Sequence, residues 1–184
     1  MKITAIRHGL VDMPWKKKYT SVEYDTAWSN YDYCDIVPIQ RKYQLDPGTK
    51  VYVTGFKRTQ QTARQFLGAE EYHVVHGLAD EVPLRSFKDS KTEKSRKLMN
   101  FFGRVQWYFP EHRQEEHRKD TYKRAVSLIR FLEKDAGGDC AIVCHGFFLR
   151  TLGRAMKRCG YKVKGKPFWT VPNLCVMTGE KKDA

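Results

Sequence analysis

Arginine and histidine follow three short apolar runs of the sequence, each of which favours a β-strand. Arg7-His8-Gly9 follows the first run, Arg58 lies shortly after the second, and His145-Gly146 follows the third. Guanidinium groups grip phosphate oxygens through paired hydrogen bonds, and a neutral imidazole can attack phosphorus to form a covalent intermediate. These residue types therefore indicate phosphoryl chemistry, provided that the fold brings the three segments together.

The elements that would position these residues alternate between strand and helix. The sequence predicts strands at residues 2–6, 50–53, 73–75, 140–144 and 173–178, and helices at 21–31, 57–67, 120–134 and 147–158. This alternation favours an α/β fold, a three-layer sandwich with a mostly parallel central sheet flanked by helices. Ligands in such sheets bind outside the carboxyl ends of the strands, so the arginines and histidines should meet there. The helix after Gly146 would add its backbone amides and its positive dipole end to an anion site.

The length of 184 residues suits one domain spanning residues 1–184. Residues 85–130 carry 13 Lys and Arg against 6 Asp and Glu, and we expect a basic, aromatic insertion at about 85–118. Its aromatic cluster, Trp107-Tyr108-Phe109, is expected to pack as core. The basic insertion also suggests a substrate that carries more negative charge than one phosphate.

Composition narrows the partners only in part. The chain holds 34 Lys and Arg against 21 Asp and Glu, a net charge of +13, which attracts phosphorylated metabolites, nucleic acid or anionic surfaces. Five cysteines at irregular spacing predict free thiols in a reducing cytoplasm rather than disulfides or a zinc site. No apolar run approaches the length that spans a membrane.

The motifs and their order resemble the histidine phosphatase superfamily, which includes cofactor-dependent phosphoglycerate mutases and acid phosphatases. Arg7-His8-Gly9 is similar to the first histidine motif of that family, and residues 143–146 are similar to the second. Residues 54–63, with Arg58, resemble its second arginine motif, and residues 78–84 stand where it places a general acid. The resemblance runs from residue 3 to about residue 178.

The resemblance implies a role for each of these residues. His8 would be phosphorylated, Arg7, Arg58 and His145 would bind the phosphate, and Glu81 would act as general acid and base. Asp80 is adjacent and remains an alternative to Glu81. The family's chemistry implies neither a cofactor nor a metal ion.

Two departures favour a phosphatase over a mutase. Leu10 and Val11 follow Arg-His-Gly, where the family often has Glu or Gln and then Thr or Ser, and residues 13–15 lack the Asn of many mutases. A phosphoglycerate-type mutase therefore remains the second reading, and a non-catalytic basic module that binds nucleic acid or phosphorylated partners is the third. For the leading reading we expect a phosphorylated small molecule or phosphoprotein as substrate and no nucleic-acid partner, and the sequence leaves the oligomeric state open.

Overall fold

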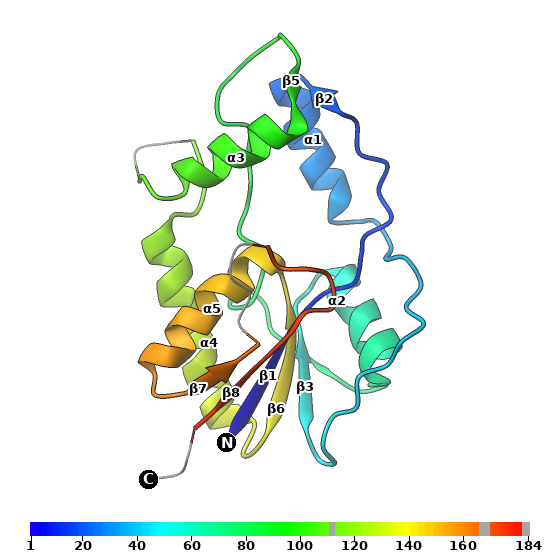
Figure 1. The fold of residues 1–184 in the computed structure, drawn as a ribbon, viewed down its shortest axis with the longest axis vertical. Coiled ribbons are helices and arrows are strands. Elements are labelled where there is room, and N and C mark those ends of the chain that lie inside the picture. Colours follow the sequence, from blue (N-terminus) through cyan, green and yellow to red (C-terminus); the bar gives the residue numbers. More distant parts are fainter. Residues whose placement is uncertain (111–112, 166–169, 182–184) are drawn as a thin grey trace.

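A six-stranded sheet forms the centre of the computed structural model, which describes residues 1–110, 113–165 and 170–181 (Figure 1). Its strands, in the spatial order β4-β3-β6-β1-β8-β7, are β4 (His73–Val74), β3 (Lys50–Val53), β6 (Cys140–Cys144), β1 (Lys2–Arg7), β8 (Val176–Glu180) and β7 (Lys162–Lys164). The first four are parallel, whereas β8 pairs with β1, and β7 with β8, in antiparallel fashion. The prediction of a mostly parallel α/β sheet is confirmed.

Helices cover both faces of this sheet (Figure 1). One face carries α4 (Arg118–Asp135) and α5 (Gly146–Arg158), and the other carries α2 (Lys57–Thr62). A π-helical turn, η1 (Ala63–Leu67), continues α2. This turn ends at Gly68, whose φ of 65° suits glycine. The three-layer arrangement agrees with the sequence prediction.

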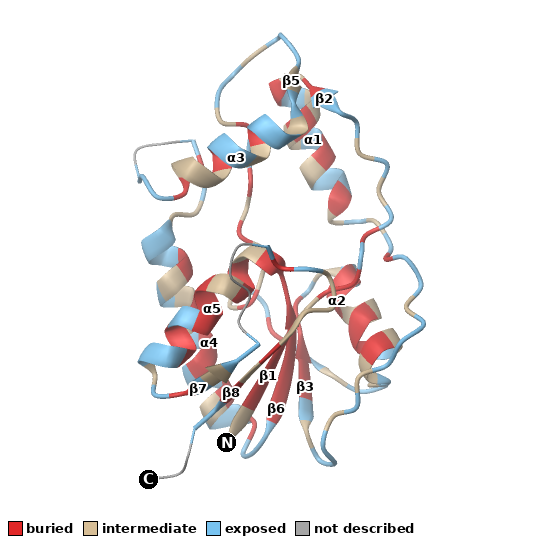
Figure 2. Cartoon of the chain, in the orientation of Figure 1, coloured by how far each residue is buried: buried red, intermediate tan, exposed pale blue. Residues whose placement is uncertain are grey.

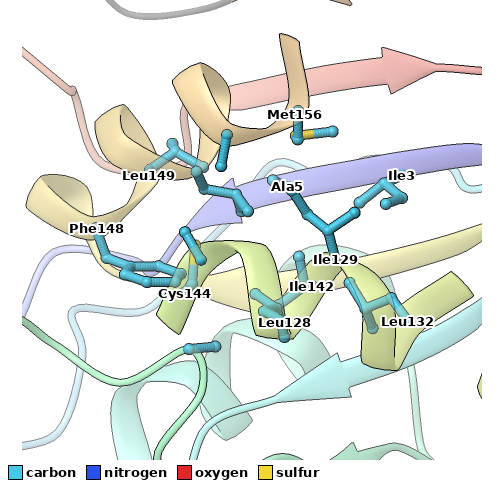
Figure 3. Close-up of a cluster of buried hydrophobic side chains, with 14 of the residues drawn as sticks. Ile3, Ala5, Leu128, Ile129, Leu132, Ile142, Cys144, Phe148, Leu149 and Met156 are labelled. Atoms are coloured by element: carbon cyan, nitrogen blue, oxygen red, sulfur yellow. The ribbon is translucent and has the colours of Figure 1, made fainter. Parts of the chain in front are cut away.

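The central strands are buried on both faces, as parallel strands between two helical layers must be (Figure 2). Figure 3 shows how Ile3 and Ile142 of the sheet pack against Leu128 and Ile129 of α4 and against Leu149 of α5. Each such fully buried side chain contributes roughly 1.5–3 kcal/mol to stability. This packing fixes the strand ends relative to the first turn of α5.

A smaller set of elements lies beyond the carboxyl ends of the parallel strands (Figure 1). It consists of β2 (Lys18–Tyr19), α1 (Ser21–Tyr31), β5 (Lys94–Ser95) and α3 (Arg96–Gln106), with β2 and β5 paired in antiparallel fashion. A capping box between Thr20 and Glu23 begins α1, which has the predicted bounds. The C-terminal end of α1 reaches the carboxyl edge of the main sheet.

Two local predictions were wrong. The last strand begins at Val176 rather than at 173, because residues 172–175 form a turn closed by the Cys175 N–H and the Pro172 carbonyl, 3.1 Å apart. The expected aromatic core cluster is core only at Trp107, whose indole N–H donates to Thr121; Tyr108 and Phe109 are about half exposed.

All five cysteines carry free thiols. Within the described ranges, no helix combines the length and the apolar character that crossing a bilayer requires.

Candidate active site

His8 stands directly after β1, and its backbone is fixed from three sides. Its N–H donates to the Cys144 carbonyl at 3.0 Å, the next residue's N–H donates to Thr62 Oγ1 at 2.8 Å, and Asn173 Nδ2 donates to the carbonyls of His8 and Gly9, both at 3.0 Å. The ring is buried, and His8 Nδ1 lies 2.7 Å from the Gly9 carbonyl. Because a carbonyl only accepts, Nδ1 carries the proton and Nε2 keeps its lone pair.

The ring of His8 is held in its neutral form. Burial, followed by the positive charge of Arg58, lowers the pKa of His8 from 6.5 to about 3. Near neutral pH, Nε2 is therefore an unprotonated nitrogen in the orientation that a nucleophile needs.

Arg58, in the first turn of α2, is completely buried. Its Nε donates to His145 Nδ1 at 3.3 Å, and its Nη1 donates to Asp32 Oδ1 at 2.8 Å. The guanidinium lies over the rings of Phe56 and Tyr31, at 4.3 and 4.8 Å from their centroids. These contacts fix the orientation of the Arg58 guanidinium plane.

Arg7 reaches the same place from the end of β1. Its Nη1 donates to the Val171 carbonyl, and its Nε packs against Gly146, the first residue of α5. A Cβ at position 146 would lie 2.8 Å from Arg7 Nε, which is too close. Gly146 thus leaves room for Arg7 to lie in this position against the N-terminus of a 13-residue helix.

Three buried nitrogen atoms of these residues, namely Arg7 Nε, His8 Nε2 and Arg58 Nη2, lack a hydrogen-bond partner among the described residues. Buried polar atoms in proteins are nearly always paired, so an unpaired set at one place needs a functional reason. Two of the three carry positive charge. The set therefore fits an anion with several acceptor oxygens.

His145, the N-cap residue of α5, completes the sequence-predicted quartet. Its ring centroid lies 5.2 Å from that of His8, and its Nε2 lies 3.2 Å from Thr54 Oγ1. Burial, followed by the charge of Arg58, places the pKa of His145 well below 6.5. Both histidines are therefore neutral in the native protein.

Glu81 approaches this pair from the loop that follows β4. Its Oε2 lies 3.6 Å from His145 Nδ1, and its Oε1 lies 4.0 Å from Arg104 Nη2. Arg104 is itself held over the Phe147 ring and donates to the Val82 carbonyl. By contrast, Asp80 Oδ2 accepts from the Gly77 N–H at 3.0 Å in a turn, while Asp80 Oδ1 is buried without a hydrogen-bond partner among the described residues.

The same three titratable residues could also bind a metal ion. One ligand atom each from His8, Glu81 and His145 lies within 4.8 Å of the others. The adjacent guanidinium groups of Arg7 and Arg58 would repel a cation, so this environment favours an anion.

Sequence reasoning missed three residues of the site. Asp32 accepts a hydrogen bond from Arg58 Nη1, and Asn173 donates a hydrogen bond to the backbone carbonyl of His8. Thr54, the first residue of the motif at residues 54–63, is buried, and its Oγ1 lies 3.2 Å from His145 Nε2. No pattern in the sequence marks Asp32 or Asn173, because each acts on a group far away in the chain, and the motif that contains Thr54 does not reveal its contact with His145.

A pocket of about 210 Å³ opens beside Glu81, between α1 and the segment around Leu84. Its lining contains four carboxylates and one guanidinium, those of Asp25, Asp32, Glu81, Glu115 and Arg85. Arg85 is paired with Glu115. The arginines that pair with Asp25, Asp32 and Glu81 lie outside this lining, so the groups that face the pocket are mostly acidic although each carboxylate is paired.

Comparison with known proteins agrees with this geometry. A sequence model described as "Histidine phosphatase superfamily (branch 1)" matches residues 3–180, which confirms the resemblance found in the motifs. A search of curated proteins finds no match.

Solved structures of low sequence identity share the fold. A phosphoserine phosphatase from Entamoeba histolytica is 15% identical, with a TM-score of 0.56 over 85% of this chain and 80% of that one. The product of a Mycobacterium tuberculosis open reading frame is 16% identical, with a TM-score of 0.50 over 84% of this chain and 79% of that one. A mycobacterial glucosyl-3-phosphoglycerate phosphatase is also 16% identical, with a TM-score of 0.50 over 85% of this chain and 79% of that one. At this identity the likeness concerns the fold alone.

Proposed function

Because the chain belongs to the histidine phosphatase superfamily (branch 1), we propose that it hydrolyses phosphomonoesters through a phosphohistidine formed on His8. The observation that carries this proposal is the neutral, unpartnered Nε2 of His8 together with the unpartnered nitrogens of two arginines whose charges act on the same ring. A nucleophile and an anion site thus coincide at the carboxyl edge of the sheet.

In the first step, His8 Nε2 attacks phosphorus and the bond from phosphorus to the ester oxygen breaks. Glu81, in its carboxylic acid form, gives its proton to the leaving oxygen, so an alcohol departs. Arg7 and Arg58 neutralise the charge on the equatorial oxygens, and the amide end of α5 at Gly146 adds its dipole. His145 lines the same site, where it contacts the phosphoryl group.

In the second step, water attacks the phosphohistidine. The Glu81 carboxylate takes a proton from the water, the P–N bond breaks, and inorganic phosphate leaves His8 neutral once more. The 3.6 Å separation between Glu81 and His145 supports Glu81 in this role over Asp80, which is engaged in the turn at Gly77. Neither step uses a metal ion or a cofactor.

The acidic pocket beside Glu81 suggests which alcohol leaves. The side chains that face the pocket are four carboxylates and one guanidinium. They disfavour a leaving group that carries extra negative charge and favour one that carries an amine, although each carboxylate also has an arginine nitrogen within 4.0 Å. We therefore propose a small phosphomonoester with a neutral or amine-bearing alcohol, in place of the highly anionic substrate suggested by the basic insertion.

The first test is phosphate release from an aryl phosphate in the presence of a chelator. Wild type should turn over and His8→Ala should not, whereas the exposed ring of His73 is a matched control whose alanine variant should keep wild-type turnover. Turnover that requires added metal, or that survives His8→Ala, would contradict the mechanism. Transfer of the phosphoryl group to a second alcohol without phosphate release would instead favour the mutase.

The substrate proposal is tested with two phosphomonoesters of similar size. 2-Aminoethyl phosphate should have a higher kcat/KM than 2-phosphoglycolate, by about tenfold or more for one opposite-sign charge contrast near several carboxylates. Glu115→Gln removes one of these carboxylates and leaves Arg85 without its partner, so the ratio should fall. A preference for 2-phosphoglycolate in wild type would overturn this part of the proposal.

A further inference from the structure

A second and larger cavity shares no lining residue with the acidic pocket. Its volume is about 1060 Å³, and its walls are the N-terminal turns of α4, the outer face of α5 and residues 107–110. This size is at the upper end of the range for small-molecule sites. None of the residues assigned to the phosphatase mechanism lines it.

Cationic side chains dominate the rim of this cavity. They come from both helices and are Arg118, Lys119, Lys123, Arg154, Lys157 and Arg158, against a single carboxylate, that of Asp120. Only Lys123 is near that carboxylate, at 3.9 Å, and the other five form no ion pair with any carboxylate in the described ranges. All six side chains are exposed, so their charges act on whatever enters from solvent.

Three aromatic residues line the floor of the cavity, of which Tyr108 is about half exposed and Trp107 is buried. Trp107 is buried and packs edge-on against Tyr108 and Phe147, with centroid separations of 4.9 and 4.8 Å. Tyr122 is half-buried and lies beneath the Arg158 guanidinium, 5.5 Å from it. The Nε2 atom of His117, which also lines the cavity, is shielded from solvent and has no hydrogen-bond partner among the described residues.

We propose that this cavity binds a free nucleotide, with its base against the aromatic floor and its phosphates on the cationic rim. Flat rings gain stacking energy on tyrosine and arginine, and phosphates gain charge-assisted hydrogen bonds from arginine and lysine. A ligand with only a flat ring would not contact the cationic rim, and a ligand with only phosphates would not contact the aromatic residues. The cationic side chains gather around a single cavity of about 1060 Å³ instead of continuing as a stripe, which suits a single nucleotide better than an extended strand.

This assignment separates the two charged regions of the molecule. The acidic pocket beside Glu81 serves the leaving alcohol of the proposed reaction, whereas the cationic cavity gathers Lys and Arg of α4 and α5, of which only Arg118 belongs to the segment at 85–118. Trp107 packs on Phe147, which follows Gly146, so a bound nucleotide would contact the wall behind the first turn of α5.

Isothermal titration with ATP as the probe tests this proposal in the full-length chain. The His8→Ala background prevents turnover of the probe. Removing two rim charges with Arg154→Gln and Lys157→Gln should weaken ATP binding by about tenfold or more. The matched control, Lys17→Gln with Lys91→Gln, removes two exposed charges outside the cavity lining and should change the affinity by less than about twofold.

Two further titrations test the role of the base. Inorganic triphosphate should bind at least about tenfold more weakly than ATP, and Tyr122→Leu should weaken ATP while leaving triphosphate unchanged. If the rim variant and its control bind ATP equally well, the proposed site is wrong. The same holds if the protein binds inorganic triphosphate as tightly as ATP. Tighter binding of a single-stranded oligoadenylate than of ATP would overturn the free nucleotide in favour of nucleic acid.

Discussion

The neutral state of His8 has a consequence for stability that His8→Asn isolates. Asparagine cannot be protonated, and its Nδ2–H can replace the Nδ1–H that now points to the Gly9 carbonyl at 2.7 Å. The variant therefore removes the titration of this buried ring while retaining its local hydrogen bond.

The magnitude follows from the two pKa values. In the unfolded chain the ring titrates near 6.5, whereas in the native protein its pKa is about 3. Between these values the unfolded state binds a proton that the native state does not, so the free energy of unfolding falls as the pH falls, by about 1.4 kcal/mol per pH unit. When the pH falls from 7.5 to 5, the titration of His8 should therefore lower the unfolding free energy of the wild type by roughly 2 kcal/mol.

Urea denaturation at several pH values over this range measures the effect. The difference in unfolding free energy between His8→Asn and wild type should shift by about 2 kcal/mol in favour of the variant on going from pH 7.5 to pH 5. His76→Asn, which removes an exposed ring, is the matched control and should retain the wild-type slope. Parallel profiles for wild type and His8→Asn would show that the native ring is not held neutral, and the nucleophile argument would fail with it.

Two other variants test the anion site. Asp32→Asn removes the carboxylate that competes for Arg58, while the contacts of Arg58 with His145 and two aromatic rings remain. Product inhibition by inorganic phosphate should tighten about three- to tenfold, since Asp32 is 38% exposed and partly screened, and an unchanged or weaker inhibition constant would contradict this competition. Gly146→Ala places a Cβ 2.8 Å from Arg7 Nε, so kcat/KM should fall about 10- to 100-fold. Circular dichroism should show an intact fold. A variant with the kcat/KM of the wild type would show that Arg7 is not needed in this position.

Much of the fold could be predicted because its signals are local. The bounds of β3, β6 and α1 agree with the prediction, since apolar runs and the capping box at Thr20 depend only on neighbouring residues. The strands β2, β5 and β7 were not predicted, because strands of two or three residues carry no periodicity and exist through their pairing partners. The widening of the α2 helix into a π-turn at Ala63 likewise has no local sequence signal.

The site was predictable in its residue types and less so in its surroundings. Arg7, His8, Arg58 and His145 come together as expected because parallel strands present their carboxyl ends at one edge. Asp32, Thr54 and Asn173 are separated in sequence from the groups they contact by 26, 91 and 165 residues. Their roles depend on contacts through space.

The sequence by itself determined which chemical groups stand at which strand ends, and in what order, because strand formation and motif spacing are local properties. Only the tertiary structure decided the state of those groups. Burial next to Arg58 keeps His8 neutral, and Asp32 shares the Arg58 fork. The fold also separated an acidic pocket beside Glu81 from a cationic cavity behind α5, which net charge could not reveal, because a field depends on where charges lie rather than on their sum.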